Sequence, residues 1–257
     1  MKKYIIFCFL FCASIHAATF FDDFDRADAL STNSASALGG DWEYKSGNGS
    51  TVVLGISGNA MHIPSGTGVN TGFNIRVYSK TVKTLNGGDN ESFKISGDIQ
   101  TATASGNTLW YGLAFNIQDD GSCYMIRMCT SNATATITAN YFRTSDQSVI
   151  AGTPAGSNTI SGAGTLALSS VYHYEISSDT PGTINYTITG ANLPGGSVDG
   201  TITFTTAILT NGYGGVYMNA GNSNIKFDNL RIETKEKGVK LMILSCLNPV
   251  TEVFRRR

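Results

Sequence analysis

The chain has 257 residues, of which 41% are hydrophobic and only 14% are charged, and its formal net charge is −1. Residues 18–234 contain ten basic and 17 acidic residues, a balance of −7, because the other eight basic residues lie near the two ends. A mildly acidic body argues against nucleic acid and anionic membrane surfaces as partners. The content of aromatic and β-branched residues excludes a disordered chain, so the composition predicts a folded domain.

The first residues, MKKYIIFCFLFCASIHAAT, predict a secretory signal peptide over residues 1–17. Lys2 and Lys3 precede an apolar block, and small residues follow it. The block is too short for a spanning helix, which needs roughly 20 apolar residues. We therefore expect a secreted or cell-surface protein without stable membrane insertion of the mature chain.

A basic tail is predicted over residues 235–257, and it contains six basic and two acidic residues. Its apolar stretch, 239–247, is too short to cross a bilayer. The three final arginines resemble the ending of PEP-CTERM sorting tails, although the Pro-Glu-Pro motif is missing. We expect a poorly ordered tail after a single domain at 18–234.

Segments that alternate apolar and polar residues follow one another between clusters of Gly, Asn, Asp and Ser, as strands do. The predicted strands span 51–56, 59–64, 72–79, 92–103, 109–118, 122–130, 135–143, 171–178, 183–190, 200–207, 214–221 and 225–233. So many strands without helical spacing predict an all-β sandwich or barrel.

Asp119 and Asp120 lie between two alternating segments and are either a catalytic pair or a turn. A two-residue turn at Asp120-Gly121 would place apolar residues opposite one another on one face. The predicted pairs are Ile117 with Tyr124, Phe115 with Ile126, and Leu113 with Met128. Since Asp and Gly suit such a turn, the two acids are interpreted as turn residues.

The opposite face of this hairpin carries the candidate ligand-binding residues Trp110, Asn116, Gln118 and Arg127. An indole ring can pack on a sugar ring, and amide or guanidinium groups can bond its hydroxyls. Alternatively, Trp110 covers a second core layer or the rim of the sheet.

Several motifs resemble the concanavalin A-like, laminin-G-like jelly-roll domains of secreted bacterial proteins. They are FFDDFDR (20–26), LGGDWEY (38–44), YGLAFNIQDDGSCYMIRM (111–128), VYHYEIS (171–177) and FDNLRIE (227–233). The resemblance implies a two-sheet antiparallel β-sandwich whose closing F-D-N strand pairs near the first. It says little about function, because this architecture is found in lectins, adhesins, glycosidases, lyases and structural domains.

Asp22, Asp23 and Asp25 could hold a structural calcium ion, which is bound by six to eight oxygen atoms and is frequent in domains of this kind. Asp41 and Asp228 could join them if the first and last strands meet. Alternatively, these acids are solvated charges that protect an edge strand from pairing. No other cofactor is expected.

No catalytic residues are predicted. The E-x-D-x-x-E strand of the retaining glucanases that share this architecture is missing, and His62 and His173 lack metal-ligand spacing. Three cysteines, Cys123, Cys129 and Cys246, remain after processing, and we expect small buried or half-buried thiols. The sequence thus favours a non-catalytic carbohydrate-binding or surface-interaction module. The alternatives are a glycosidase or polysaccharide lyase that uses Asp98, Glu175 or Tyr residues from separate strands, and a structural exoprotein.

Overall fold

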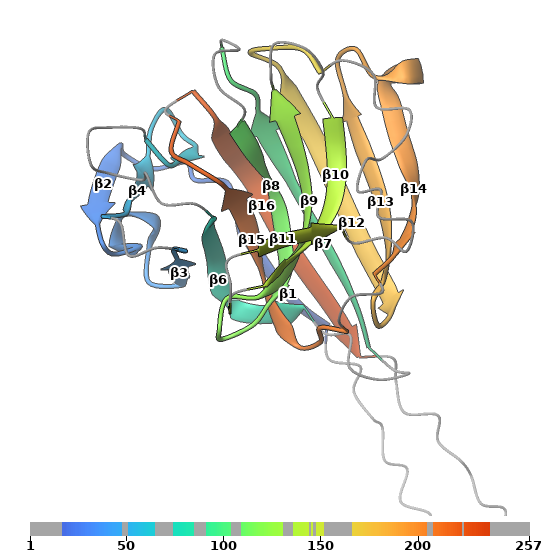
Figure 1. The fold of residues 1–257 in the computed structure, drawn as a ribbon. Helices are drawn as coiled ribbons and strands as arrows, with labels where there is room; N and C mark the ends of the chain where they lie inside the picture. The colour runs from blue at the N-terminus through green and yellow to red at the C-terminus, as the bar shows by residue number, and fades with distance from the viewer. Residues whose placement is uncertain are drawn as a thin grey trace, which may run out of the picture.

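The computed structural model describes residues 17–47, 51–64, 74–84, 91–103, 109–130, 136–143, 145, 148–151, 166–204, 208–222 and 224–236. Within these residues the chain forms two antiparallel sheets packed face to face, with two short 3-10 turns and no α-helix (Figure 1). The protein is therefore an all-β sandwich, as the alternation predicts.

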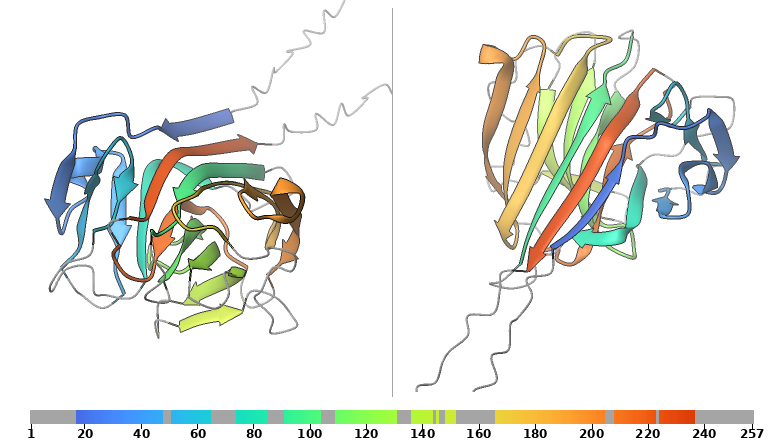
Figure 2. Two further views of the ribbon diagram at one scale, coloured as in Figure 1. Left: turned by 90° about the horizontal axis from the view of Figure 1, so that it is seen from above. Right: turned by 180° about the vertical axis from the view of Figure 1, so that it is seen from behind.

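The larger sheet has nine described strands in the order β14-β13-β12-β7-β16-β5-β4-β2, and β1 also pairs with β16. Its strands are β1 (Ala17–Asp22), β2 (Ala29–Thr32), β4 (Val53–Ile56), β5 (Met61–His62), β7 (Glu91–Gln100), β12 (Val171–Thr180), β13 (Thr183–Gly190), β14 (Ser197–Thr203) and β16 (Lys226–Glu236). Figure 2 shows this sheet from behind, with β12, β7, β16 and β1 side by side.

The smaller sheet has seven described strands in the order β11-β10-β9-β8-β15-β6-β3. They are β3 (Trp42–Lys45), β6 (Ile75–Thr84), β8 (Leu109–Ile117), β9 (Cys123–Thr130), β10 (Thr136–Arg143), β11 (Ser148–Ala151) and β15 (Gly212–Met218). The 3-10 turns are η1 (Ser36–Leu38) and η3 (Pro194–Gly196).

The main core lies between the two sheets, because alternate side chains of each strand point inward. In β12 the buried residues are Tyr172, Tyr174, Ile176 and Ser178, and the residues between them face solvent or are half-buried. Aromatic rings from the two sides of the sandwich pack together in this core, and the ring centroids of Tyr124 and Phe204 are 4.1 Å apart. Such an apolar interior stabilises a sandwich mainly by removing surface from water.

The first and last described strands pair with each other, as the family resemblance implies. Ala17 lies opposite Lys235, and Asp22 lies opposite Leu230. β16 continues through Glu236, two residues beyond the predicted end of the domain. β1 begins at Ala17, the last residue of the predicted signal peptide; the rest of that segment and nearly all of the predicted tail lie outside the described residues. Within the described part of the chain, no helix is long and apolar enough to span a membrane.

The β8–β9 hairpin differs from the predicted register by two residues. Leu113 lies opposite Ile126 and Phe115 lies opposite Tyr124, whereas the two-residue turn would have placed Phe115 opposite Ile126. The predicted pairing is wrong because the connection is longer. The backbone N–H of Gly121 donates to the carbonyl of Gln118 at 2.7 Å, in a turn that begins before the two acids.

Ile117 was predicted to face the main core, and this is also wrong. Asn116 has a positive φ of 50°, which reverses the alternation at the end of β8 and directs Ile117 to the outer face. Because a two-residue slip preserves the faces, Leu113 and Phe115 still point inward as predicted.

Candidate functional site

The outer face of the seven-stranded sheet, which points away from the sandwich, carries a second apolar cluster. Trp110 and Tyr213 pack against it and are themselves half-buried. Its buried members are Tyr78, Ala114, Ile117, Cys123, Met125 and Tyr217. Much of this face is therefore a covered layer, in agreement with the alternative that Trp110 lies over a second core layer.

Trp110 and Arg127 form the part of this face in which an aromatic ring and a polar group meet. The Arg127 guanidinium carbon lies 4.3 Å from the centroid of the Trp110 ring and 5.9 Å from that of Tyr217. Its Nε donates to Asn140 Oδ1 at 2.8 Å, and the hydroxyl of Thr138 donates to the same oxygen at 2.8 Å. A guanidinium held between rings and an amide is fixed in orientation, as a recognition group must be.

The backbone on both sides of Trp110 is also fixed. Its N–H donates to Asn219 Oδ1 at 2.9 Å, and its carbonyl accepts from the Asn219 N–H at 2.9 Å. Trp110 is thus held by its backbone near the start of β8, and the residue is half-buried.

Asn116 and Gln118, the other two predicted ligand-binding residues, lie at the opposite end of β8. The Asn116 side chain is buried, accepts from the Thr84 hydroxyl at 2.6 Å and donates to the Leu209 carbonyl at 2.9 Å. Gln118 Nε2 donates to the carbonyls of Asn116 and Thr210. Both amides hold the hairpin to neighbouring segments, so the structure does not bring them to Trp110.

Three residues that the sequence did not indicate lie near this pair: Tyr217 and Asn140 contact Arg127, and Arg76 lies on the next strand beyond Tyr217. Tyr217 and Arg76 are opposite each other on β15 and β6, and Asn140 lies on β10 next to β9. Tyr217 Oη donates to Asn74 Oδ1 at 2.5 Å, and the Arg76 guanidinium donates to the Asn74 carbonyl. These side chains come together only because strands far apart in the sequence pair with each other. The sequence does contain one signal: alternation in NIRVY, residues 74–78, places Arg76 on the face that points away from the core.

Burial changes the acid–base properties of this face. It raises the pKa of Tyr217 to about 12 and that of the Cys123 thiol to about 12. Burial lowers the pKa of Arg76, but a guanidinium starts so high that it stays protonated at neutral pH. Neither Tyr217 nor Cys123 is therefore prepared to act as a base or nucleophile near neutrality.

The interpretation of Asp119 and Asp120 as turn residues is confirmed. Both are exposed at the hairpin tip, and Asp120 accepts hydrogen bonds from the Ser122 N–H at 2.8 Å and the Ser122 hydroxyl at 3.0 Å. Gly121 has a φ of 90°, which a residue without a side chain adopts readily. The prediction that Cys123 is a buried thiol is also confirmed, and no disulfide forms there.

The acids proposed for calcium have protein partners. Asp22 accepts from both terminal nitrogens of Arg26, from the Phe24 N–H and from Trp42 Nε1. Asp23 accepts from the Asp25 N–H at 3.1 Å. Among the described residues, no group of three His, Cys, Asp or Glu side chains could hold a metal ion. The calcium site therefore stays a prediction.

Asp98 and Glu175, named for a catalytic alternative, lie on the outer face of the nine-stranded sheet. Asp98 Oδ1 is 2.7 Å from His173 Nδ1, and Glu175 forms an ion pair with Lys94 at 2.8 Å. His173 is exposed, as its place on the polar face of β12 predicts. The acids belong to a row of polar pairs over a solvated surface rather than to a cleft.

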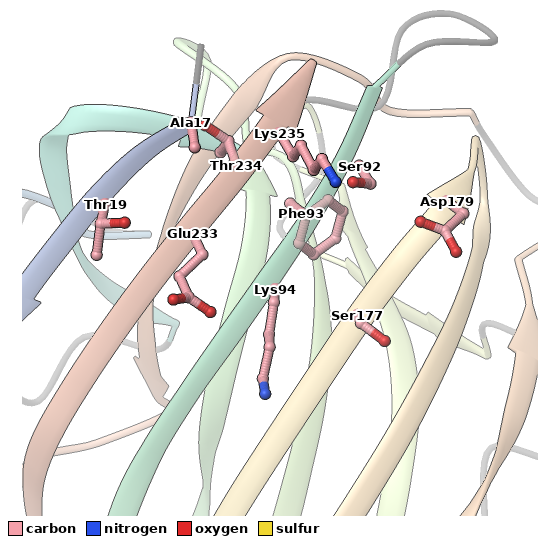
Figure 3. A pocket seen from close by; sticks show the side chains of 10 residues that line it. All are labelled: Ala17, Thr19, Ser92, Phe93, Lys94, Ser177, Asp179, Glu233, Thr234 and Lys235. Atoms are coloured by element: carbon pink, nitrogen blue, oxygen red, sulfur yellow. The ribbon is translucent and has the colours of Figure 1, made fainter. Parts of the chain in front are cut away.

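Two shallow cavities lie away from Trp110. One of about 350 Å³ opens on the nine-stranded sheet near the end of β16, where Lys94, Asp179 and Glu233 project from neighbouring strands (Figure 3). The other, of about 480 Å³, lies at η1 and β3; it is lined by serine, alanine and glycine residues around η1 and by the four residues of β3, Trp42, Glu43, Tyr44 and Lys45. Since the first is open and lined by charges of both signs, it lacks the convergent apolar walls of most ligand sites.

Comparison with known proteins supports the fold. No protein-family profile matches the chain, and no curated protein matches it by sequence. Similar solved structures include an endo-1,3-β-glucanase from Streptomyces sioyaensis, with a TM-score of 0.52 and 13% identity over 85% of this chain and 96% of that one. Peanut lectin has a TM-score of 0.51 and 11% identity over 86% and 97% of the two chains. The CBM2 module of the evolved Dit of Lactobacillus casei BL23 phage J-1 has a TM-score of 0.50 and 12% identity over 85% and 96%. At these identities the likeness concerns the architecture alone, a sandwich of two antiparallel β-sheets.

Proposed function

We propose that the protein is a secreted, non-catalytic carbohydrate-binding protein, and that it contacts a glycan through Trp110 and Arg127 on the outer face of the seven-stranded sheet. The observation that carries this proposal is the half-buried Trp110 ring, which is fixed by the Arg127 guanidinium 4.3 Å from its centroid. An aromatic ring of fixed orientation offers an apolar platform for a pyranose, and the guanidinium offers donors for its hydroxyls.

The surroundings of the pair favour binding over catalysis. Tyr217, the nearest group able to move a proton, is buried and has its pKa raised to about 12. Asp98 and Glu175 lie on the other sheet, where each has a basic partner. The jelly-roll architecture is compatible with this role, since a lectin and a carbohydrate-binding module share it.

A glycan array compares the wild-type protein with the Trp110→Ala variant. We expect the variant to lose binding at least tenfold, because aromatic platforms contribute a large share of the contact energy at such sites. Phe21→Ala is the matched control: Phe21 is 52% exposed on β1 of the other sheet, so its loss should leave binding unchanged. Equal binding by wild type and Trp110→Ala would remove this site.

Intrinsic fluorescence gives a second readout, because the chain has only two tryptophans. Trp42 is 4% exposed and lies in the main core, so a spectral change on adding glycan reports on Trp110. Incubating the same glycans with the protein and analysing the products tests the non-catalytic part of the proposal. Turnover of any of these glycans by the wild-type protein would contradict it.

A further inference from the structure

β3 is the last strand at one end of the seven-stranded sheet, and in the described chain it pairs only with β6 (Figure 1). The Lys80 N–H donates to the Asp41 carbonyl at 2.8 Å, directly before β3. Residues of an antiparallel strand alternate between bonding to one neighbour and to the other. Glu43 and Lys45 therefore bond to β6, whereas the N–H and carbonyl of Tyr44 point to the opposite, outer edge of the sheet.

The space beside this edge is not filled by any described segment. The cavity of about 480 Å³ lies along β3, and all four residues of the strand line it. The Trp42 N–H donates to the Gly39 carbonyl at 3.3 Å, but the Trp42 carbonyl and both backbone groups of Tyr44 have no partner among the described residues. Unpaired backbone groups at a sheet edge are a template for a further strand.

The charges on β3 decide which strand can pair with it. Glu43 and Lys45 lie on either side of Tyr44 and point to the same face, and all three residues are half-buried. Glu43 pairs with Lys80 at 3.0 Å and accepts from Tyr78 Oη at 2.9 Å, and its carboxylate oxygens can each accept one more hydrogen bond. Charged residues usually protect an edge from pairing, but two charges of opposite sign permit a partner with the reverse order.

A second copy of β3, running antiparallel, has this reverse order. When Tyr44 lies opposite Tyr44 of the second copy, Glu43 lies opposite its Lys45 and Lys45 lies opposite its Glu43. The two Tyr44 residues then exchange a pair of backbone hydrogen bonds across the join. The half-buried Tyr44 ring packs against the main core, so the second ring would cover its exposed part.

Other registers and the long edge of the other sheet lack this complementarity. Sliding the second β3 by one step in either direction that keeps the hydrogen bonds places Glu43 opposite Glu43, or Lys45 opposite Lys45, and like charges directly opposite are destabilising. β14, at one end of the nine-stranded sheet, contains the acid Asp199 and no basic residue. No self-pairing of β14 therefore brings opposite charges together.

We infer that the protein forms a two-fold symmetric dimer in which two β3 strands pair antiparallel at Tyr44. Every contact then occurs twice, as a two-fold axis requires, and the two ion pairs between Glu43 and Lys45 fix the register. The two seven-stranded sheets become one continuous sheet. Because strands of four residues bury little surface, the dimer is weak and forms at micromolar concentration or above.

The dimer presents both outer faces of the seven-stranded sheets on the same side, because the two-fold axis of an antiparallel strand pair is perpendicular to the sheet. β15 and β6 lie between β8 and β3, so the two β8 strands are seven strand spacings apart. At about 4.8 Å for each spacing this separation is about 34 Å. A glycan polymer that reaches both copies of Trp110 would bind with avidity, although the dimer itself does not depend on glycan binding.

Sedimentation velocity from micromolar to millimolar protein concentration tests this dimer with reversed charges. Glu43→Lys and Lys45→Glu should each weaken dimerisation at least tenfold, because both ion pairs become pairs of like charge. An equimolar mixture of the two variants should dimerise as the wild type does, since each charge then meets its opposite. Circular dichroism of each variant confirms that the fold survives the loss of the bond between Glu43 and Lys80.

Matched variants on the other sheet control for net charge. Asp199→Lys on β14 and Lys235→Glu on β16 change exposed residues by the same charges and should dimerise as the wild type does. Amide exchange followed by NMR gives a readout at the backbone. The Tyr44 N–H should exchange more slowly as protein concentration rises, whereas the N–H groups of Glu43 and Lys45, which face β6, should be protected at every concentration.

Three results would overturn the dimer. The first is a wild-type protein that stays monomeric at every concentration, and the second is a mixture of Glu43→Lys and Lys45→Glu that dimerises no better than either alone. The third is a dimer that Asp199→Lys disrupts while the β3 variants do not, which would place the contact on β14. None of these results bears on the glycan array, and loss of glycan binding in Trp110→Ala leaves dimerisation unchanged, so the two proposals fail separately.

Discussion

Asp22 joins the first strand to the loop that follows it and to β3, and its replacement by alanine should destabilise the fold. Its carboxylate accepts from Trp42 Nε1 at 2.8 Å and pairs with Arg26 at 2.7 Å. Trp42 is 4% exposed, and its ring packs against Phe20 and Phe24 with centroids 5.5 and 5.4 Å apart. Removing the carboxylate therefore leaves a buried indole N–H without its acceptor.

The magnitude follows from these two interactions. A buried donor without a partner costs about 1–3 kcal/mol, and a partly exposed ion pair adds at most about 1 kcal/mol. We expect Asp22→Ala to lower the free energy of unfolding by about 1–4 kcal/mol. In a domain of this size each kcal/mol shifts Tm by roughly 2–4 °C, so Tm should fall by about 2–16 °C in calorimetry.

Asp23→Ala is the control, since Asp23 is exposed and its bond is to the neighbouring Asp25 N–H. It should change stability by less than about 0.5 kcal/mol. Equal losses for Asp22→Ala and Asp23→Ala would refute the role given to the Trp42 bond. The same measurement with calcium or a chelator tests the calcium prediction. A calcium-dependent rise in Tm that Asp22→Ala abolishes would show that the carboxylate exchanges its protein partners for the ion.

Three further predictions concern the sheets. Asn116→Ala should cost about 3 kcal/mol in chemical unfolding, because it removes the bond with Thr84 and keeps a side chain at φ 50°, yet glycan affinity should not change. Gly112→Ala should prevent stable folding in chemical unfolding experiments, since a Cβ at this position would lie 2.1 Å from a backbone oxygen of β9. Gly40→Ala is the control: a Cβ there would have no atom within 4 Å, so this variant should be as stable as the wild type. Burial lowers the pKa of His62 in the folded protein. The buried neutral imidazole therefore contributes its full stability above the unfolded pKa of about 6.5, and this contribution is lost as pH falls through the folded pKa. Tm measured from pH 8 to pH 5 should consequently fall less steeply in His62→Gln than in the wild type.

The strands were largely predictable because their alternation is strict. All twelve predicted segments overlap observed strands, and the four strands not predicted, β1, β2, β3 and β11, have six residues or fewer. Short strands contain too few alternations to be distinguished from loops. The local pattern did not predict which strands lie next to each other in the sheets. The exceptions are the hairpins and the pairing of the first and last strands, which the family resemblance implied.

Of the candidate site, only the residues of the β8–β9 hairpin could be predicted from the sequence. Trp110 and Arg127 lie on the same face of adjacent strands, and the actual register brings them closer than the predicted one, with Gly112 rather than Ala114 opposite Arg127. The structure does not bring Asn116 and Gln118 to Trp110, and a residue at positive φ, Asn116, interrupts the alternation just before the turn. Asn is among the residues that tolerate a positive φ, so an asparagine at position 116 was the one sequence signal of this break in the alternation. Arg76 and Tyr217 lie 141 positions apart, beyond the reach of periodicity.

The antiparallel pairing of β1 with β16 has a mechanical consequence. Because Ala17 lies opposite Lys235, a force that separates these two residues loads the outermost hydrogen bonds of the pair first and releases them one after another. Bonds that open in sequence resist less than bonds sheared together. When the protein is stretched between these two positions in an optical trap, β1 and β16 should separate first and at low force. The central strands β7 and β12 should remain paired until higher force is applied.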